Sequence, residues 1–290
     1  MGEWPQMRGI TEARGTYEGA RDRAAELIGL IEVLGVRVPQ YGRLREYAKQ
    51  FATICGAGNG RPPRGLNLER LHRGLLEVAE LSLIIEHLAG DGGVPGLLGV
   101  LAPAMSGGIT LGDEKNQSSA RDFQFEMLVA ALFKRAGYGV ALSEPDVIVT
   151  TNHGNVGIAA KRPRSQDNLR RLFEDADDQI RRSGYHGIVA IDISFLLLPN
   201  NLHIPAGDGG RGIVKAAVDA FAADTWKDAR LFVDPSRTFG YIAYAALVAA
   251  NHATPKLSVA RGCVFGNFIP FSDDRMVILR EFRERVTCMV

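Results

Sequence analysis

The stretch YGVALSEPDVIVTTNHGNVGIAAK, residues 138–161, decides the fold. It contains three short runs in which Val and Ile recur, at about residues 138–142, 145–151 and 155–161, and such runs are typical of β-strands. The segment NHGN, residues 152–155, separates the second run from the third, and Asn and Gly tolerate the positive φ angles of a tight turn. We therefore expect a small sheet built from three consecutive strands.

The elements on either side extend this sheet into an α/β domain. A helix is predicted over residues 121–137, a second from about Gln166 to Ser183, and a strongly apolar strand over residues 187–194. The order is thus αβββαβ. Further on, we predict a helix near residues 213–226 and favour two strands over residues 239–250 and 256–269, although a helix is an alternative for the first of these.

The N-terminal part has a different pattern. From Tyr17 to about Leu88, apolar residues recur at intervals of three and four, which predicts a bundle of helices. A polar stretch begins at Ser106 and ends before the helix of the sheet domain. These patterns predict a helical domain over residues 1–105, a linker over residues 106–118 and an α/β domain over residues 119–290.

Composition limits the class of protein. The chain has 290 residues, of which 46% are hydrophobic and 23% charged, enough to build a sizeable core. No apolar run reaches the roughly eighteen residues of a membrane span, and the first residues lack the apolar segment of a secretory leader. The three cysteines form no close pair, so we expect reduced thiols and a cytoplasmic location. The histidines never fall at metal-ligand spacing, so any metal should be held by carboxylates.

Three charged residues of the α/β part are candidates for chemistry. Glu126 projects from the helix face that should pack on the sheet, where a carboxylate needs a partner. Asp146 follows Pro145 inside a Val/Ile strand, a position that indicates either an edge strand or a ligand. Lys161 shares a strand face with Ala159 and Gly157. A glutamate at a partly exposed helix edge is the simpler interpretation of Glu126.

Together these residues resemble the motif of the PD-(D/E)XK nuclease superfamily. The matching pieces are Glu126 in FQFEMLVAALF, Pro145–Asp146 in SEPDVIV, Ala159–Ala160–Lys161 in GIAAKRP, and Gln179 in DADDQI. The resemblance implies a restriction-endonuclease-like fold with a mixed central sheet. It also implies hydrolysis of phosphodiester bonds, with DNA as the expected substrate and Mg²⁺ or Mn²⁺ as the cofactor. In this interpretation Asp146, Glu126 and the main-chain carbonyl of Ala160 hold the metal, and Lys161 stabilises the attacking hydroxide.

The sequence departs from this motif at Ala159, where the superfamily usually has Asp or Glu. Three explanations are open. The acid has moved to the following helix, where Asp175 is the preferred substitute and Glu174 the second; or a natural acidic residue has been replaced by alanine; or the domain has lost catalysis and kept its fold. An exposed helix of mixed charge is the alternative interpretation of the segment that contains Glu174 and Asp175.

Two groups of basic residues could contact phosphates. The first follows the lysine and comprises Arg162, Arg164, Arg170 and Arg171; the second, in the helical domain, includes Arg43, Arg45 and Lys49. Solvated surface is the alternative for both groups. The competing function is a non-catalytic module that binds nucleic acid or docks a larger protein.

The resemblance further suggests a role in restriction or anti-phage defence beside a helicase or other ATPase subunit. A homo-oligomer is also compatible with the sequence, and no membrane partner is expected.

Overall fold

The structure is a computed structural model, and it describes residues 9–57, 66–90, 93–106, 119–197, 204–205, 209–250 and 257–287. Its helices are α1 Tyr17–Val33, α2 Arg43–Gly56, α3 Leu68–Leu88, α4 Leu97–Ala104, α5 Ser119–Arg135, α6 Leu169–Ser183, α7 Ser194–Leu197, α8 Gly209–Ala229 and α9 Met276–Thr287, with a 3₁₀ turn at Gln166–Asn168. Its strands are β1 Gly9–Gly15, β2 Gly139–Ser143, β3 Asp146–Thr151, β4 Gly154–Lys161, β5 His186–Asp192, β6 Ile204–Pro205, β7 Thr238–Ala250 and β8 Leu257–Asn267.

One mixed sheet organises the described chain. Its strand order is β1-β8-β7-β5-β4-β3-β2, with the short β6 beside β7. Strands β2, β3 and β4 form an antiparallel meander, β5 and β7 continue it in parallel with β4, and β8 and β1 close it in the antiparallel sense. The expected α/β class and the order αβββαβ over α5 to β5 are therefore confirmed.

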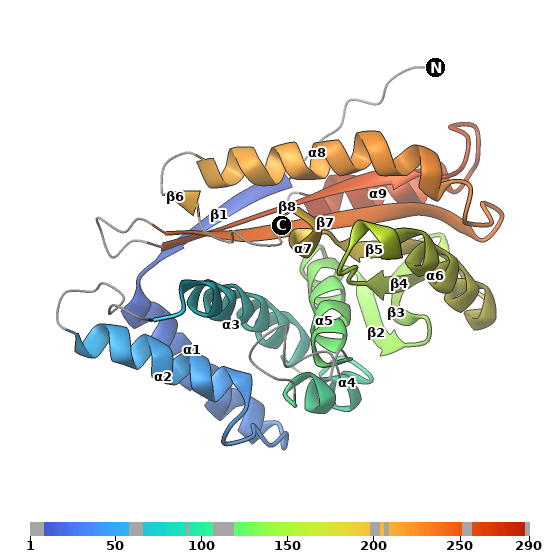
Figure 1. Ribbon diagram of the computed structural model, residues 1–290. Coiled ribbons are helices and arrows are strands. Elements are labelled where there is room, and N and C mark those ends of the chain that lie inside the picture. The colour runs from blue at the N-terminus through green and yellow to red at the C-terminus, as the bar shows by residue number, and fades with distance from the viewer. Residues whose placement is uncertain are drawn as a thin grey trace.

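Helices cover both faces of the sheet (Figure 1). The side chains of β4 alternate between them: Val156, Ile158 and Ala160 belong to the apolar core that α5 shares, whereas Ala159 belongs to the core that α6 and α8 share. The two-residue period of a strand produces this division. Consequently α5 and α6, which carry candidate site residues, lie on opposite faces of the same strands.

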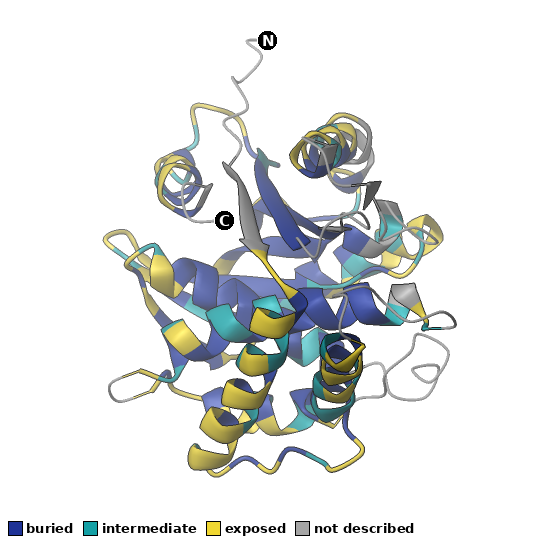
Figure 2. Ribbon diagram, turned by 90° about the vertical axis from the view of Figure 1, so that its left-hand side faces the viewer, coloured by how far each residue is buried: buried dark blue, intermediate teal, exposed yellow. Residues whose placement is uncertain are grey.

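The N-terminal helices pack onto this sheet. Helix α3 contacts α5, β7 and β8, and α4 contacts α5 and β2. Leu81 and Ile84 of α3 and Leu101 of α4 lie in the same apolar core as Leu128 of α5. Figure 2 shows buried residues on the sheet and on the helix faces turned toward it, with exposed residues on the outer sides. Except for Ser106, the expected linker over residues 106–118 lies outside the described residues.

Most elements agree with the sequence predictions, and five of the described ones were missed: β1, α4, α7, β6 and α9. Helices α1 to α3 and α8 and strands β7 and β8 are present, so the strand interpretation of residues 239–250 is correct. Of the missed elements, strand β1 pairs with β8 and makes the N-terminal part more than helical. Within the described part of the chain, no helix has the length and apolar character needed to span a membrane.

Candidate active site

Asp146 stands at the first position of β3 and is held from two directions. Its Oδ2 accepts a hydrogen bond from the backbone N–H of Ala160 at 2.7 Å, and its Oδ1 accepts one from Nε2 of Gln179 at 2.6 Å. The same amide group of Gln179 donates to the carbonyl of Pro145. Burial raises the pKa of Asp146, while Lys161 and these hydrogen bonds oppose the rise. Asp146 is thus an oriented carboxylate rather than a solvated residue at a sheet edge.

Lys161, the last residue of β4, points to the same place. Its Nζ lies 2.5 Å from Oε1 of Gln179 and 3.5 Å from Oδ2 of Asp146. The side chains of Lys161 and Asp146 are only 18% and 12% exposed. Gln179 therefore bridges the lysine and the aspartate with its two amide atoms, and the predicted grouping of Asp146, Lys161 and Gln179 is present.

Glu126 approaches this cluster from α5 on the other side of the sheet. Burial and, after it, the negative charge of Asp146 raise its pKa to about 8, while the charge of Lys161 opposes the rise. Glu126 is half-buried, and the charges of Asp122 and Glu144 also act on it. An acidic group in this position holds its proton at neutral pH unless a cation lies nearby.

Ala159 lies beside the cluster in apolar surroundings. Val147 pairs with Ile158, so Asp146 and Ala159 occupy the next position of the same antiparallel ladder. Ala159 is fully buried in a core cluster that also contains Phe173 and Ala176 of α6. The amide of Gln179 spans Asp146 and Lys161, so a neutral polar side chain and not a third carboxylate completes the cluster.

The proposed substitute acids point elsewhere. Asp175 is exposed and lies 3.7 Å from Arg171 in an i,i+4 ion pair, with 57% of its side chain accessible. Glu174 pairs with Arg170 at 2.9 Å. Neither forms a hydrogen bond or ion pair with Asp146, Lys161 or Gln179, all of which are described. The face that α6 turns to the sheet carries Phe173, Ala176 and Ile180, so Asp175 falls on the outer side despite sharing the spacing of four with Gln179.

Two of the expected phosphate-binding arginines are structural. Arg162 is 7% exposed, and its Nε lies 2.7 Å from Asp192 and its guanidinium 5.5 Å from the centre of the Phe125 ring. Arg43 is 1% exposed and donates to the carbonyl of Ala104 and to Gln124. The prediction that Arg162 and Arg43 contact nucleic acid is therefore wrong, because each is enclosed by partners from other elements.

The other expected phosphate contacts are accessible. Arg164 is exposed, and its charge acts on Asp122 near the site. Arg170 and Arg171 are exposed but hold the ion pairs described above. Arg45 pairs with Glu32 and Lys49 with Glu46. Among the predicted contacts, Arg164 is the exposed one whose charge reaches the neighbourhood of the site.

A buried charge network between α3 and α5 escaped the sequence prediction. Glu77 lies 2.9 Å from Arg121 and 3.3 Å from Arg43, and Glu80 accepts a hydrogen bond from Gln124 at 2.7 Å. Burial tends to raise the pKa of Glu77, but the surrounding arginines hold it below its usual value. Burial raises the pKa of Glu80 to about 7. The available sequence signal was a pair of glutamates three residues apart in the largely apolar segment LLEVAELSLII of α3.

The donors at the site suit a hard divalent cation in part. Glu126 and Asp146 carry carboxylate oxygens of the kind that such a cation prefers, and the effect of Asp146 on the pKa of Glu126 is the repulsion that a bound cation would relieve. Among the described residues, no three Asp, Glu, His or Cys side chains are grouped so that they could hold a metal.

Comparison with known protein families, with curated proteins and with solved structures gives no match to this chain.

Proposed function

We propose that the chain is a Mg²⁺-dependent nuclease that hydrolyses phosphodiester bonds, with DNA as its substrate. One observation carries the proposal: Asp146, Lys161 and Gln179 meet at one end of the sheet, and Glu126 is close enough for its pKa to respond to both charged members. The strand order β5-β4-β3-β2, with an antiparallel meander and one parallel neighbour, supports a restriction-endonuclease-like fold.

The residues divide into ligands and a cation. Asp146, Glu126 and the carbonyl of Ala160 would hold Mg²⁺. A Mg²⁺ ion held by these residues would supply Lewis-acid chemistry, polarising the phosphoryl group and lowering the pKa of water. Lys161 stabilises the negative charge that develops on the attacked phosphate or on hydroxide. Gln179 restrains the ammonium group of Lys161, and the N–H of Ala160 orients Asp146.

Arg164 provides the first contact with the substrate backbone outside the cluster. It is exposed, and its charge reaches Asp122 near the cluster. Phosphate contacts of this kind position a nucleic acid without reading its sequence. A role in restriction or anti-phage defence, a cytoplasmic location and an ATPase partner belong to the same proposal and rest on the resemblance to the PD-(D/E)XK superfamily.

The alternative is a non-catalytic module with the same fold, and the burial of Ala159 favours it. Ala159 lies in an apolar core with Phe173 and Ala176. An apolar residue is expected at such a position if the domain binds no metal and so needs no third carboxylate there. The basic group of the helical domain is less suited to such binding, because Arg43 is buried and Arg45 and Lys49 are held in ion pairs.

Cleavage of supercoiled, linear and single-stranded DNA with Mg²⁺ or Mn²⁺ tests the proposal. The chain should cleave, Lys161→Ala should abolish cleavage, and Lys215→Ala, which removes an exposed lysine of α8, should not. Isothermal titration with Mg²⁺ should show binding that Asp146→Asn weakens. Ala159→Glu should strengthen metal binding.

Two outcomes would contradict the proposal. A folded chain that neither binds Mg²⁺ nor cleaves any of these substrates, with Ala159→Glu equally inactive, supports the non-catalytic module. Cleavage that survives Lys161→Ala would mean that the activity does not belong to this cluster.

A further inference from the structure

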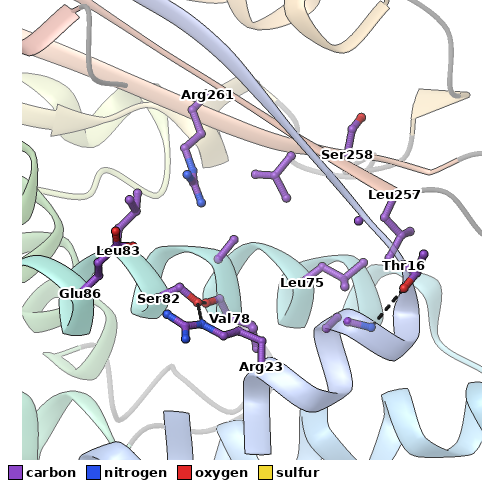
Figure 3. Close-up of a pocket in the computed structure, with 15 residues that line it drawn as sticks. Thr16, Arg23, Leu75, Val78, Ser82, Leu83, Glu86, Leu257, Ser258 and Arg261 are labelled. Atoms are coloured by element: carbon purple, nitrogen blue, oxygen red, sulfur yellow. Dashed lines mark hydrogen bonds between the residues drawn. The ribbon is translucent and has the colours of Figure 1, made fainter. Parts of the chain in front are cut away.

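A cavity lies between the N-terminal helices and the sheet, away from the candidate active site. It has a volume of about 430 Å³ and is lined by α1, α3 and the first residues of β8 (Figure 3). Small-molecule pockets in proteins have volumes of roughly 300–1,000 Å³. The cavity arises because small residues line it: Gly15 at the end of β1, Gly19 and Ala20 of α1 and Ala79 of α3 cannot fill the space between the helices and the strand.

Most of the cavity wall is apolar, and one charged side chain enters it without a partner. Arg261 of β8 is 8% exposed and points from the strand toward α3 (Figure 3). Its buried Nε has no hydrogen-bond partner, and within the described chain no hydrogen bond or ion pair reaches its guanidinium. Its charge acts on Glu80 and Tyr244 only at longer range. Burying a cation without a partner is costly, so a ligand that placed an anionic group beside Arg261 would stabilise the folded chain.

Of the other charged residues of the cavity, Arg23 is held by partners and Glu86 is exposed to solvent. Arg23 donates to Oγ of Ser82 at 2.9 Å and pairs with Glu26 at 2.6 Å. Glu86 is exposed and lies 4.0 Å from His87. Thr16 accepts the N–H of Gly19, so the N-terminus of α1, the positive end of its dipole, also borders the cavity. The interior is therefore apolar with one buried positive group.

We propose that this cavity binds a small amphipathic anion whose carboxylate pairs with Arg261 and whose apolar body lies against Leu75, Val78 and Leu257. A planar carboxylate matches the fork of a guanidinium and can form two parallel hydrogen bonds with it. The apolar body gains from leaving water along the walls formed by α3 and β8. The site is independent of the proposed nuclease, since it shares no residue with the cluster around Asp146.

Isothermal titration calorimetry with octanoate and with octan-1-ol tests the proposal. Octanoate should bind at least about tenfold more tightly than the alcohol, because only the acid forms the charge-assisted pair. Arg261→Gln should remove this preference, whereas Arg21→Gln, which changes an α1 arginine that does not line the cavity, should leave it intact.

A second variant separates binding from folding. Ala79→Trp fills the cavity from α3, keeps Arg261 and should prevent octanoate binding while far-ultraviolet circular dichroism stays unchanged. Equal affinity for octanoate and octan-1-ol, no binding of octanoate to the folded wild-type chain, or unchanged octanoate binding in Ala79→Trp would each overturn the proposal. DNA cleavage is not part of the readout, so failure here leaves the proposed nuclease function untouched.

Discussion

Gln179 of α6 accepts a hydrogen bond at 2.5 Å from Nζ of Lys161, the last residue of β4, and so restrains the ammonium group of this lysine. The other atom of the same amide donates to Asp146 at 2.6 Å. A neutral side chain thus aligns a cation and an anion that lie 3.5 Å apart. Positioning of this kind contributes to catalysis because small displacements of a reacting group reduce the rate strongly.

Removing this bridge should slow cleavage more than it weakens folding. In Gln179→Ala, Lys161 loses its restraint, and we expect kcat for DNA cleavage to fall by about tenfold to a hundredfold. Gln166→Ala, an exposed glutamine in the 3₁₀ turn before α6, is the matched control and should have little effect. Single-turnover cleavage rates measure the effect, and rates equal to those of the wild-type chain would remove Gln179 from the site.

Glu126 should make stability depend on pH in the absence of metal. Its pKa is raised from its ordinary value of 4.5 to about 8 in the folded chain. Between these values the folded state holds a proton that the unfolded state has released, so its contribution to stability is present at low pH and is lost as the pH rises toward 8. Glu80 acts in the same direction, since its pKa is about 7.

Urea unfolding from pH 5 to pH 9 in EDTA isolates the contribution of Glu126. Glu126→Gln should flatten the decline in the free energy of unfolding across this range, while the part due to Glu80 remains. Adding Mg²⁺ to the wild-type chain should reduce the decline at the alkaline end. If Glu126→Gln and the wild-type chain followed parallel curves, Glu126 would titrate near its ordinary pKa.

The ion pair between Arg162 and Asp192 should be structural. Their atoms lie 2.7 Å apart, and the side chains are 7% and 2% exposed. In Asp192→Asn the buried guanidinium loses its nearer charged partner and keeps Glu80 at 3.8 Å, so the free energy of unfolding should fall by about 3 kcal/mol, the lower end of the range for a broken buried pair. Asp175→Asn breaks the exposed ion pair with Arg171 and should change the free energy of unfolding by less than about 1 kcal/mol. Equal losses in the two variants would contradict this assignment.

Arg164 should contribute to nucleic-acid affinity where Arg162 does not. Charge reversal in Arg164→Glu should weaken DNA binding and reduce the slope of log K against log salt by about 1 or more, as the loss of a phosphate contact does. Arg182→Glu, at the far end of α6 from Arg164, is the control and should preserve the slope. Fluorescence anisotropy at several salt concentrations measures both, and an unchanged slope in Arg164→Glu would exclude the contact.

The local pattern of the chain determined the β4-β3-β2 edge of the sheet and the faces on which Glu126, Asp146 and Lys161 lie. The three strands of residues 138–161 follow from Val/Ile content and from Asn and Gly at the turn, which act within a few residues. Two-residue spacing placed Ala159 and Lys161 on one strand face, and helical spacing turned Glu126 toward the sheet. These inferences required no knowledge of distant partners.

Only the tertiary structure decided which charged side chains are exposed and so able to contact a nucleic acid. Arg162 and Arg164 stand two residues apart and look alike in the sequence, yet Arg162 is enclosed by Asp192 and Phe125 while Arg164 is exposed. Arg43 is buried because Gln124, 81 positions away, comes to its side. Strand β1 exists because β8 offers it an edge. Burial and charge pairing depend on groups that meet only when the chain is folded, so no local pattern contains them.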